Sequence, residues 1–412
     1  MSSKNEDELS MLPEEIRFHI LSLMPTKFAV QTSVLSKTWR CSWMFVTKLD
    51  FDDTLSKFVD RVMVSCKSSQ IQLFRLRFSN TTCCEKADVS NWIDKAVNLH
   101  VRELDIQVNE FKVPLSLFTC KTLTKLRLHG SSIDDQSVWK FPNSVCLPCL
   151  KTLDIAVFSD PFVNMFNLIR GCPVLESLSL VVSRQEDYVF NISTLKQLKL
   201  TWLQCATVTI NKVVLRVPNL EYLFVGGVLC SHFVMEDLSS LVEASTSLHS
   251  IPYDHLWVDF LKGVSGVKSL SIQNMNSIDS LFTSPMFPNM RNLEIKCCMH
   301  LGIISQFLDS SPQLQHICIE KEENCCCWVK PMLVPSSSIQ TSLTSLKFSS
   351  CKGGNRGIKF LEYILRNAKV LKTVTIIWEN LRVEEGRCLA AKVLNFPRAS
   401  LHCEIHFHEN WI

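Results

Sequence analysis

A short apolar pattern that recurs along most of the chain restricts the fold more than any other feature. The pattern is L-x-x-L-x-L, with isoleucine, valine, methionine or an aromatic residue in place of some leucines, and it occurs 13 times. Its mean interval of about 25 residues lies within the roughly 20–29 residues of a leucine-rich repeat. The triplets are Leu73–Leu76–Phe78, Val101–Leu104–Ile106, Leu123–Leu126–Leu128, Leu150–Leu153–Ile155, Leu175–Leu178–Leu180, Leu195–Leu198–Leu200, Leu220–Leu223–Val225, Leu248–Ile251–Tyr253, Val267–Leu270–Ile272, Met290–Leu293–Ile295, Leu314–Ile317–Ile319, Leu343–Leu346–Phe348 and Leu371–Val374–Ile376.

The last two apolar residues of each triplet lie two positions apart, so they point to the same side of a short strand. One strand cannot bury them alone, which predicts that neighbouring units stack into a parallel sheet over a continuous core. Segments between the strands, such as 160–170 and 303–309, have the composition of helices. We therefore expect an irregular α/β solenoid, with the parallel sheet on its concave side and helices or loops on its convex side.

The residues between the apolar positions of each strand would form the exposed face of that sheet. Charges of both signs alternate along the first strands, and polar or aromatic residues dominate later ones. A nucleic-acid groove would carry one sign, whereas a mixed surface suits a protein partner. We expect this face to bind a target protein, and no nucleic acid, through residues that include Arg75, Arg77, Lys125, Arg127, Lys199, Tyr222 and Phe224.

The N-terminal stretch 9–43 has a different pattern, which predicts three short helices. The first follows Pro13 and ends at Pro25, the second covers Lys27–Val34, and the third covers Lys37–Trp43. A unit this short cannot bury all of its large apolar side chains within itself. The stretch is therefore either the end of a larger core or a docking surface for the helices of a partner.

The same stretch, LPEEIRFHILSLMPTKFAVQTSVLSKTWRCSW, resembles the F-box of plant F-box/leucine-rich-repeat proteins. Its matches include Leu-Pro at its start, Pro-Thr-Lys in its centre and Leu-Ser-Lys near its end; Met24, Phe28 and Thr38 depart from the usual pattern. The resemblance implies binding to the Skp-type adaptor of a cullin ubiquitin ligase. The adaptor-binding residues expected here are Leu12, Pro13, Ile16, Ile20, Leu21, Pro25, Leu35 and Trp39.

The C-terminal segment departs from the regular repeats. Residues 360–365 and 384–394 read as helices, and Leu401, Cys403, Ile405 and Phe407 alternate as a last strand would. The segment resembles the FBD domain that ends many plant F-box/leucine-rich-repeat proteins. Because an array needs a cover for its last core face, we expect an α/β end cap whose last strand pairs with the strand at 371–378.

Composition and motifs exclude several other classes. The net charge of +3 gives no general attraction to nucleic acid, and no apolar run is long enough to span a membrane. The first eight residues are polar, so we expect no signal peptide, reduced cysteines and a location in the nucleus, the cytoplasm or both. The adjacent-cysteine clusters Cys83–Cys84, Cys297–Cys298 and Cys325–Cys327 lack the C-x-x-C spacing of a zinc site, and no catalytic motif is present. His402, His406 and His408 are better explained as a solvated strand face than as a metal site, so neither enzyme activity nor a cofactor is expected.

These observations predict a non-catalytic subunit that holds a target protein for ubiquitination. The alternative is a repeat scaffold or small-ligand receptor whose F-box recruits no ligase. The expected divisions are a polar tail at 1–8, the three-helix F-box at 9–48, a connector helix at 49–70, leucine-rich repeats at 71–356 and the FBD-like cap at 357–412.

Overall fold

The computed structural model describes most of the chain, and it divides the chain into two compact units, residues 1–184 (unit 1) and 185–412 (unit 2). The described residues are 8–52, 55–78, 86–109, 111–130, 142–156, 162–182, 187–203, 210–273, 283–296, 301–321, 336–350, 355–379 and 383–410. None of the helices in these ranges has the length and apolar character needed to cross a membrane.

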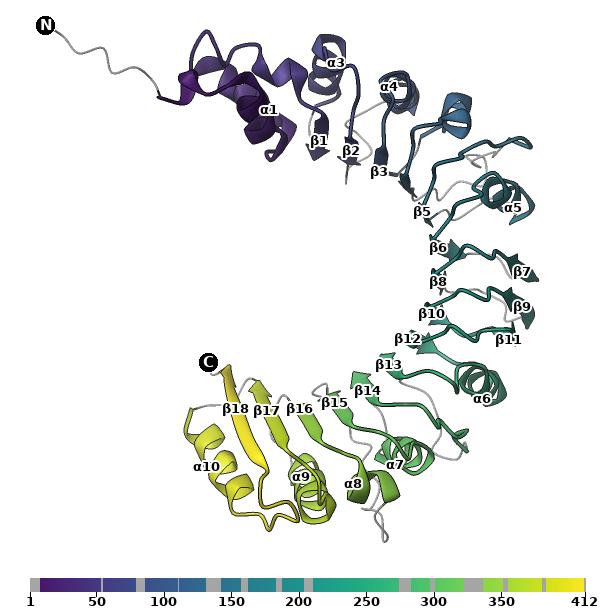
Figure 1. The fold of residues 1–412 in the computed structure, drawn as a ribbon, viewed down its shortest axis with the longest axis vertical. Helices are drawn as coiled ribbons and strands as arrows, with labels where there is room; N and C mark the ends of the chain where they lie inside the picture. The colour runs from purple at the N-terminus through teal and green to yellow at the C-terminus, as the bar shows by residue number, and fades with distance from the viewer. Residues whose placement is uncertain are drawn as a thin grey trace, which may run out of the picture. The chain divides into compact units, whose positions relative to one another are not determined.

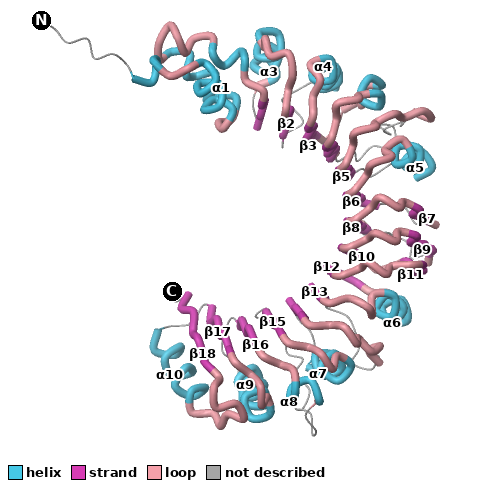
Figure 2. Tube along the Cα trace, in the orientation of Figure 1, coloured by secondary structure: helices cyan, strands magenta, loops and turns pink. Residues whose placement is uncertain are grey.

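Unit 1 begins with short helices and continues as a parallel sheet covered by helices on one face (Figures 1 and 2). Each strand pairs in parallel with the next one along the chain. Its helices are η1 (Glu8–Met11), α1 (Glu14–Ser22), α2 (Thr26–Gln31), η2 (Thr32–Val34), η3 (Ser42–Phe45), α3 (Ser56–Ser65), α4 (Lys86–Asn98), η5 (Leu115–Thr119) and α5 (Phe162–Arg170). Its strands are β1 (Lys48–Asp52), β2 (Leu73–Phe78), β3 (Glu103–Val108), β4 (Lys125–His129), β5 (Thr152–Ala156) and β6 (Ser177–Val182).

Unit 2 repeats this arrangement and adds a second, smaller parallel sheet. The main sheet contains β8 (Gln197–Trp202), β10 (Tyr222–Val228), β12 (Glu243–Ser250), β13 (Ser269–Gln273), β14 (Asn292–Lys296), β15 (His316–Lys321), β16 (Ser345–Ser350), β17 (Thr373–Glu379) and β18 (Glu404–Asn410). The second sheet contains β7 (Tyr188–Asn191), β9 (Asn211–Arg216) and β11 (Ser231–Glu236). The helices are α6 (Asp254–Gly263), α7 (Leu301–Ser310), α8 (Ser337–Thr341), α9 (Asn355–Asn367) and α10 (Val383–Leu394).

The second sheet departs from the expected layer of helices and loops. Its strands lie on the same side of the main sheet as the helices of unit 2 (Figure 1). Phe233 of β11 packs edge-on against Trp202 of β8 and Phe260 of α6. Short strands rich in β-branched residues, such as NKVVLR, therefore supply the covering layer in this part of unit 2.

The inward residues of the triplets form the core, as the repeat pattern predicts. Leu178 and Leu180 on β6 are buried, for example, whereas Ser177 and Ser179 on the same strand are partly exposed. The alternation places every second side chain on the face of the sheet that carries no helices, which we call the open face. Together with the parallel pairing, this burial confirms the predicted leucine-rich-repeat fold.

Three assignments from the sequence are wrong in register or incomplete. The strand β1 was missed, because residues 49–70 were assigned to a connector helix; α3 covers only part of that range. Val46, Leu49 and Phe51 in fact form a buried triplet one interval before the first one identified. The cross-strand register then pairs Phe74 with Leu104, so the next triplet is Ile71–Phe74–Leu76 and not Leu73–Leu76–Phe78.

The third wrong assignment lies in β12. The triplet Leu248–Ile251–Tyr253 was assigned there, but the register pairs Leu223 of β10 with Ala244 and Val225 with Thr246. The true triplet is therefore Leu241–Ala244–Thr246, whose side chains are buried. A pattern of large apolar residues does not detect this triplet, because alanine is small and threonine is polar. Beside it, the strand β10 ends in an irregularity at Gly227, where φ is +84° and a Cβ would lie 1.8 Å from the carbonyl oxygen of Trp202.

The C-terminal segment lies within unit 2 and extends its main sheet. As expected, β18 pairs in parallel with β17, and α9 and α10 precede these two strands. Val374 and Ile376 of β17 are buried. However, β18 begins only at Glu404, so Leu401 lies outside the strand and is exposed. Leu394, the last residue of α10, is also exposed.

Candidate functional site

The N-terminal helices are held together by one buried arginine. Arg17 of α1 donates hydrogen bonds from Nε to the Leu12 carbonyl oxygen at 3.1 Å, and from one terminal nitrogen to the Thr38 carbonyl oxygen at 3.0 Å and Ser42 Oγ at 3.1 Å. It also lies 3.7 Å from Glu14. Because these bonds join the start of α1 to the turn before η3, Arg17 fixes the arrangement of the segment. The sequence signal for this role was an arginine within an apolar helix pattern, and the role of Arg17 was not predicted from it.

The expected third helix is not formed. Residues 37–41 are turns, followed by the short 3-10 helix η3. The Ser42 hydroxyl donates to the Thr38 carbonyl oxygen at 2.9 Å, and Arg17 donates to that same carbonyl. Serine side chains that bond to nearby carbonyls compete with regular helix geometry, which accounts for the difference.

The eight residues expected to contact an adaptor separate into three groups by exposure. Leu21 and Trp39 are buried, with 1% and 3% of their surface exposed, so they belong to the core of the segment and cannot offer contact area. Leu12 and Ile20 are half-buried. The remaining four are exposed and are Pro13, Ile16, Pro25 and Leu35.

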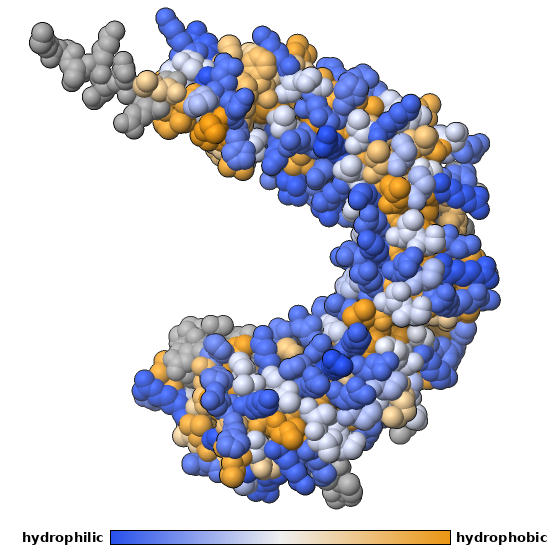
Figure 3. Space-filling model, viewed as in Figure 1, coloured by the Kyte–Doolittle hydropathy of each residue, from blue (hydrophilic) through white to orange (hydrophobic). Residues whose placement is uncertain are grey.

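Further exposed apolar side chains enlarge this surface. Val34 is 85% exposed, Leu23 is 68% exposed and Leu35 is 61% exposed. Phe28, at a position that departs from the usual F-box pattern, is also exposed. Apolar atoms gather over the N-terminal helices in Figure 3. We call the exposed apolar residues of this segment the apolar face; they are Leu9, Met11, Ile16, Leu23, Phe28, Val34, Leu35 and Phe45.

The N-terminal helices are joined directly to the first strand of the sheet. The backbone N–H of Asp50 in β1 donates to the buried Thr26 Oγ1 of α2 at 2.7 Å. The backbone N–H of Lys67 donates to the Met44 carbonyl oxygen, also at 2.7 Å. Because α2 lies against β1, which pairs on its other side with β2, the helices cover the first strand of the sheet in unit 1.

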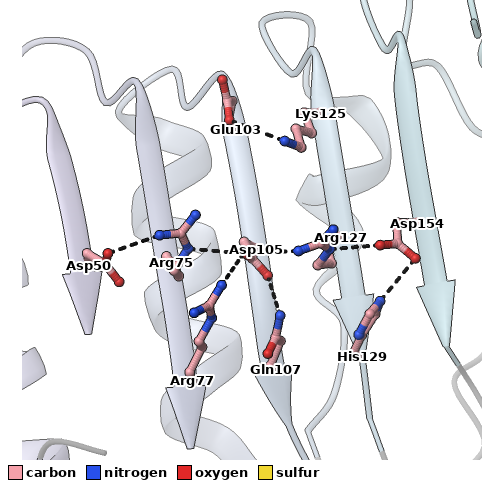
Figure 4. Close-up of polar contacts among 10 residues, drawn as sticks. All are labelled: Asp50, Arg75, Arg77, Glu103, Asp105, Gln107, Lys125, Arg127, His129 and Asp154. Carbon is pink, nitrogen blue, oxygen red and sulfur yellow. Dashed lines mark hydrogen bonds and ion pairs between the residues drawn. The ribbon is translucent and has the colours of Figure 1, made fainter. Parts of the chain in front are cut away.

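On the open face of unit 1, most of the charged residues form a connected ladder across β1 to β5, and Glu103 and Lys125 form a separate ion pair beside it (Figure 4). Arg75 bonds to Asp50 at 3.1 Å and to Asp105 at 3.0 Å. Arg127 lies 3.8 Å from Asp105 and donates to Asp154 at 2.7 Å. We call this set the charge ladder; its members are Asp50, Arg75, Arg77, Glu103, Asp105, Gln107, Lys125, Arg127, His129 and Asp154.

The structure thus places all four predicted cationic residues of unit 1 in the ladder. Arg75 and Arg127 each join carboxylates of two neighbouring strands, whereas Arg77 approaches only Asp105, at 3.5 Å, and Lys125 only Glu103, at 4.0 Å. In unit 2, Lys199 Nζ lies 5.8 Å from the centroid of the Tyr222 ring, a cation–π contact, and Phe224 is half-buried on the same face.

Asp154 at the end of the ladder gives the first testable prediction. Partial burial acts to raise the pKa of the Asp154 carboxyl, but the hydrogen bonds and charges of His129 and Arg127 outweigh it and lower the pKa. Asp154 therefore stabilises the fold above the ordinary carboxyl pKa of about 3.9, and this contribution is lost as pH falls through the lower folded value. We expect Asp154→Asn to lower the urea midpoint at pH 7 and to cost progressively less below about pH 4. The exposed Asp52→Asn is the control, and a difference from wild type that is independent of pH would contradict the assignment.

Groups that could support other chemistry were also assessed. Among the described residues, no group of three or more His, Cys, Asp or Glu side chains could hold a metal ion. His406 and His408 of β18, and His402 just before this strand, are exposed. The clusters Cys83–Cys84, Cys297–Cys298 and Cys325–Cys327 lie outside the described residues.

Comparison with known proteins agrees with this architecture. An F-box domain model matches residues 9–47, a model of the LRR repeats of FBD-associated F-box protein At5g56370 matches residues 89–188, and an FBD model matches residues 333–376. The FBD match therefore begins before residue 357, where the sequence pattern placed the cap, and covers β16 and much of β17.

Relatives from Arabidopsis thaliana match over nearly the whole chain. The F-box/FBD/LRR-repeat protein At1g78750 is 28% identical over 456 residues, which cover 98% of this chain and 96% of the relative. A second, the F-box/FBD/LRR-repeat protein At4g13965, is 30% identical over 433 residues, which cover 97% of both chains. With an F-box segment, stacked leucine-rich repeats and an FBD segment in the same order along the chain, this protein belongs to the plant F-box/FBD/LRR-repeat family.

Proposed function

We propose that the chain is the substrate-recognition subunit of an SCF-type (Skp–cullin–F-box) ubiquitin ligase. F-box proteins generally act in such ligases, and the F-box implies a Skp-type adaptor as partner. In this proposal, the apolar face docks the adaptor, the adaptor links the chain to cullin, and the repeats hold a target protein. The protein would work in the nucleus, the cytoplasm or both.

The observation that carries the proposal is the apolar face. Soluble proteins seldom expose many large apolar side chains side by side unless they meet a partner there. Here they come from helices whose own core is already filled by Leu21, Ala29 and Trp39, and whose geometry is fixed by Arg17. The exposed residues are therefore not needed for the fold of the segment, which leaves them for an interface.

The mechanism is one of proximity, and the chain performs no bond chemistry of its own. A target bound to the repeats would be held close to the ubiquitin-charged enzyme that the cullin positions. Such tethering converts an encounter between separate molecules into a reaction at high effective concentration. The hydrogen bonds of Thr26 and Met44 to the first repeats support this role, because they connect the docking helices to the repeats without a long linker.

The second testable prediction concerns Leu35. We expect Leu35→Glu to weaken capture of a purified Skp-type adaptor by about thirtyfold or more, since a charge would enter an apolar interface. The thermal unfolding midpoint should change little, because Leu35 is 61% exposed. Biolayer interferometry with immobilised adaptor measures the affinity, and Leu401→Glu, at a 93% exposed position of unit 2, is the control.

Equal adaptor affinity for both variants would show that the apolar face is not part of the adaptor interface. No adaptor capture by the wild-type chain would favour the alternative, a repeat scaffold or small-ligand receptor that recruits no ligase.

A further inference from the structure

The charged side chains of the ladder differ in their exposure as well as in their position along the strands. The side chains of Asp105 and Asp154 are only 9% and 16% exposed, whereas those of Arg77 and Lys125 are 40% and 49% exposed. Arg75, Arg127 and His129 lie between these values. Two carboxylates are as exposed as the cations beside them, Glu103 beside Lys125 and Asp50 beside Arg75. Across β2 to β4, a partner that approaches the open face therefore meets mainly cationic groups, because Glu103 is the one well-exposed carboxylate of the ladder on these three strands.

The hydrogen-bonding capacity of the ladder is also unequal. Asp105 is shared by three guanidinium groups, those of Arg75, Arg77 and Arg127, and by the side-chain amide of Gln107. Each guanidinium has five N–H donors, so one carboxylate cannot accept hydrogen bonds from all the donors of three guanidinium groups. Arg75 and Arg127 each have a second carboxylate, but Arg77 has no other among the described residues, and its Nε–H has no acceptor there.

Arg77 belongs to a row that crosses the strands. The register pairs Arg77 of β2 with Gln107 of β3, and Gln107 with His129 of β4. All three side chains lie toward the carboxyl-terminal ends of their strands (Figure 4). Two strand spacings, about 10 Å, separate the ends of this row. One turn of a polyproline II segment rises about 9 Å over three residues, so its first and fourth side chains point the same way and match this distance.

The geometry points to an acidic segment of the target protein as the occupant of this row. It would lie across β2 to β4, with one carboxylate on the guanidinium of Arg77 and another, about three residues away, near His129. Charge complementarity supports this partner, because guanidinium groups bind carboxylates through paired hydrogen bonds. The inference rests on the proposed function only in that the repeats hold a target, and the adaptor plays no part in it.

The test uses the full chain and a short fluorescein-labelled peptide with glutamate at every third position and glycine or serine elsewhere. Fluorescence anisotropy measures its affinity for the wild type and for Arg77→Gln. This substitution removes the cation without leaving Asp105 unpaired, because Arg75 and Arg127 remain. The matched control is Arg216→Gln, which removes an exposed arginine from the second sheet of unit 2.

We expect Arg77→Gln to weaken binding about tenfold, as the loss of a charge-assisted hydrogen bond predicts, and Arg216→Gln to leave it unchanged. A peptide with glutamine in place of glutamate should bind at least about tenfold more weakly to the wild type. Equal losses in the two variants, or no binding of the glutamate peptide by the wild type, would overturn the inference. So would tripolyphosphate that binds more tightly than the peptide and displaces it, since the row would then be a small-anion site.

Adaptor capture by the same variants separates this inference from the proposed function. Arg77→Gln leaves the apolar face intact and should bind the adaptor as the wild type does. Leu35→Glu should lose the adaptor and keep the peptide, and the reverse result would contradict both assignments.

Discussion

Leu178→Asp is expected to unfold the repeats of unit 1 and not only the strand that carries it. Leu178 is fully buried in β6, so the substitution removes a core side chain and places a charge where no partner is available. Together these effects cost more than about 4 kcal/mol, a large part of the stability of a typical domain. Because stacked repeats share their interfaces, the loss should spread to neighbouring strands.

The matched control for Leu178→Asp is Ser177→Asp. It makes the same charge on the same strand, but on the open face opposite Thr152 of β5. Circular dichroism should show a large fall in the unfolding midpoint or insoluble protein for Leu178→Asp, and a small change for Ser177→Asp. Similar losses in both variants would mean that the two faces of β6 have been assigned wrongly.

A second large effect is expected when the chain is truncated after Asn355. The truncation removes α9, β17, α10 and β18 and leaves β16 as the edge of the main sheet of unit 2. It uncovers the core around Leu346 and Phe348, which are buried in the full chain, and it exposes unpaired backbone groups along β16. Such an edge is a template for pairing with other chains. Size-exclusion chromatography with light scattering should therefore show dimers or aggregates.

A point substitution tests the same cap without a truncation. Ile376→Asp places a charge in the buried side of β17, whereas Thr375→Asp places it on the open face beside Lys347. We expect only Ile376→Asp to lower the unfolding midpoint strongly and to promote aggregation. If the truncated chain stays monomeric with an unchanged unfolding curve, the segment is a separate module and not the end of the array.

The repeat pattern was informative because burial in a strand follows a period of two. The last two residues of most triplets, such as Leu153 and Ile155 or Leu178 and Leu180, are buried on strands of the expected sheet. The pattern failed where the core is not made of large apolar residues. In β12 the core positions are occupied by Ala244 and Thr246. The pattern instead matched the nearby Leu248 and Ile251, which lie at other positions of the repeat.

The candidate sites were predicted less completely than the fold. The F-box motif located the docking segment, but it could not separate exposed residues such as Leu35 from core residues such as Trp39, because both are large and apolar. Arg17 was missed since its role depends on carbonyl and hydroxyl groups brought to it from Thr38 and Ser42. A linear motif contains no information on which groups will meet across a turn.

The sequence by itself determined the order of the parts, the parallel stacking of the repeats and most of the residues that face the core, because each follows from local spacing and side-chain polarity. Only the tertiary structure decided that Asp50 joins the charge ladder, since this required β1 to pair with β2. It alone also decided which charges are exposed. Along the sequence the signs simply alternate, but Asp105 stays near the sheet while longer arginine and lysine side chains extend above it, so the open face across β2 to β4 presents mainly cations.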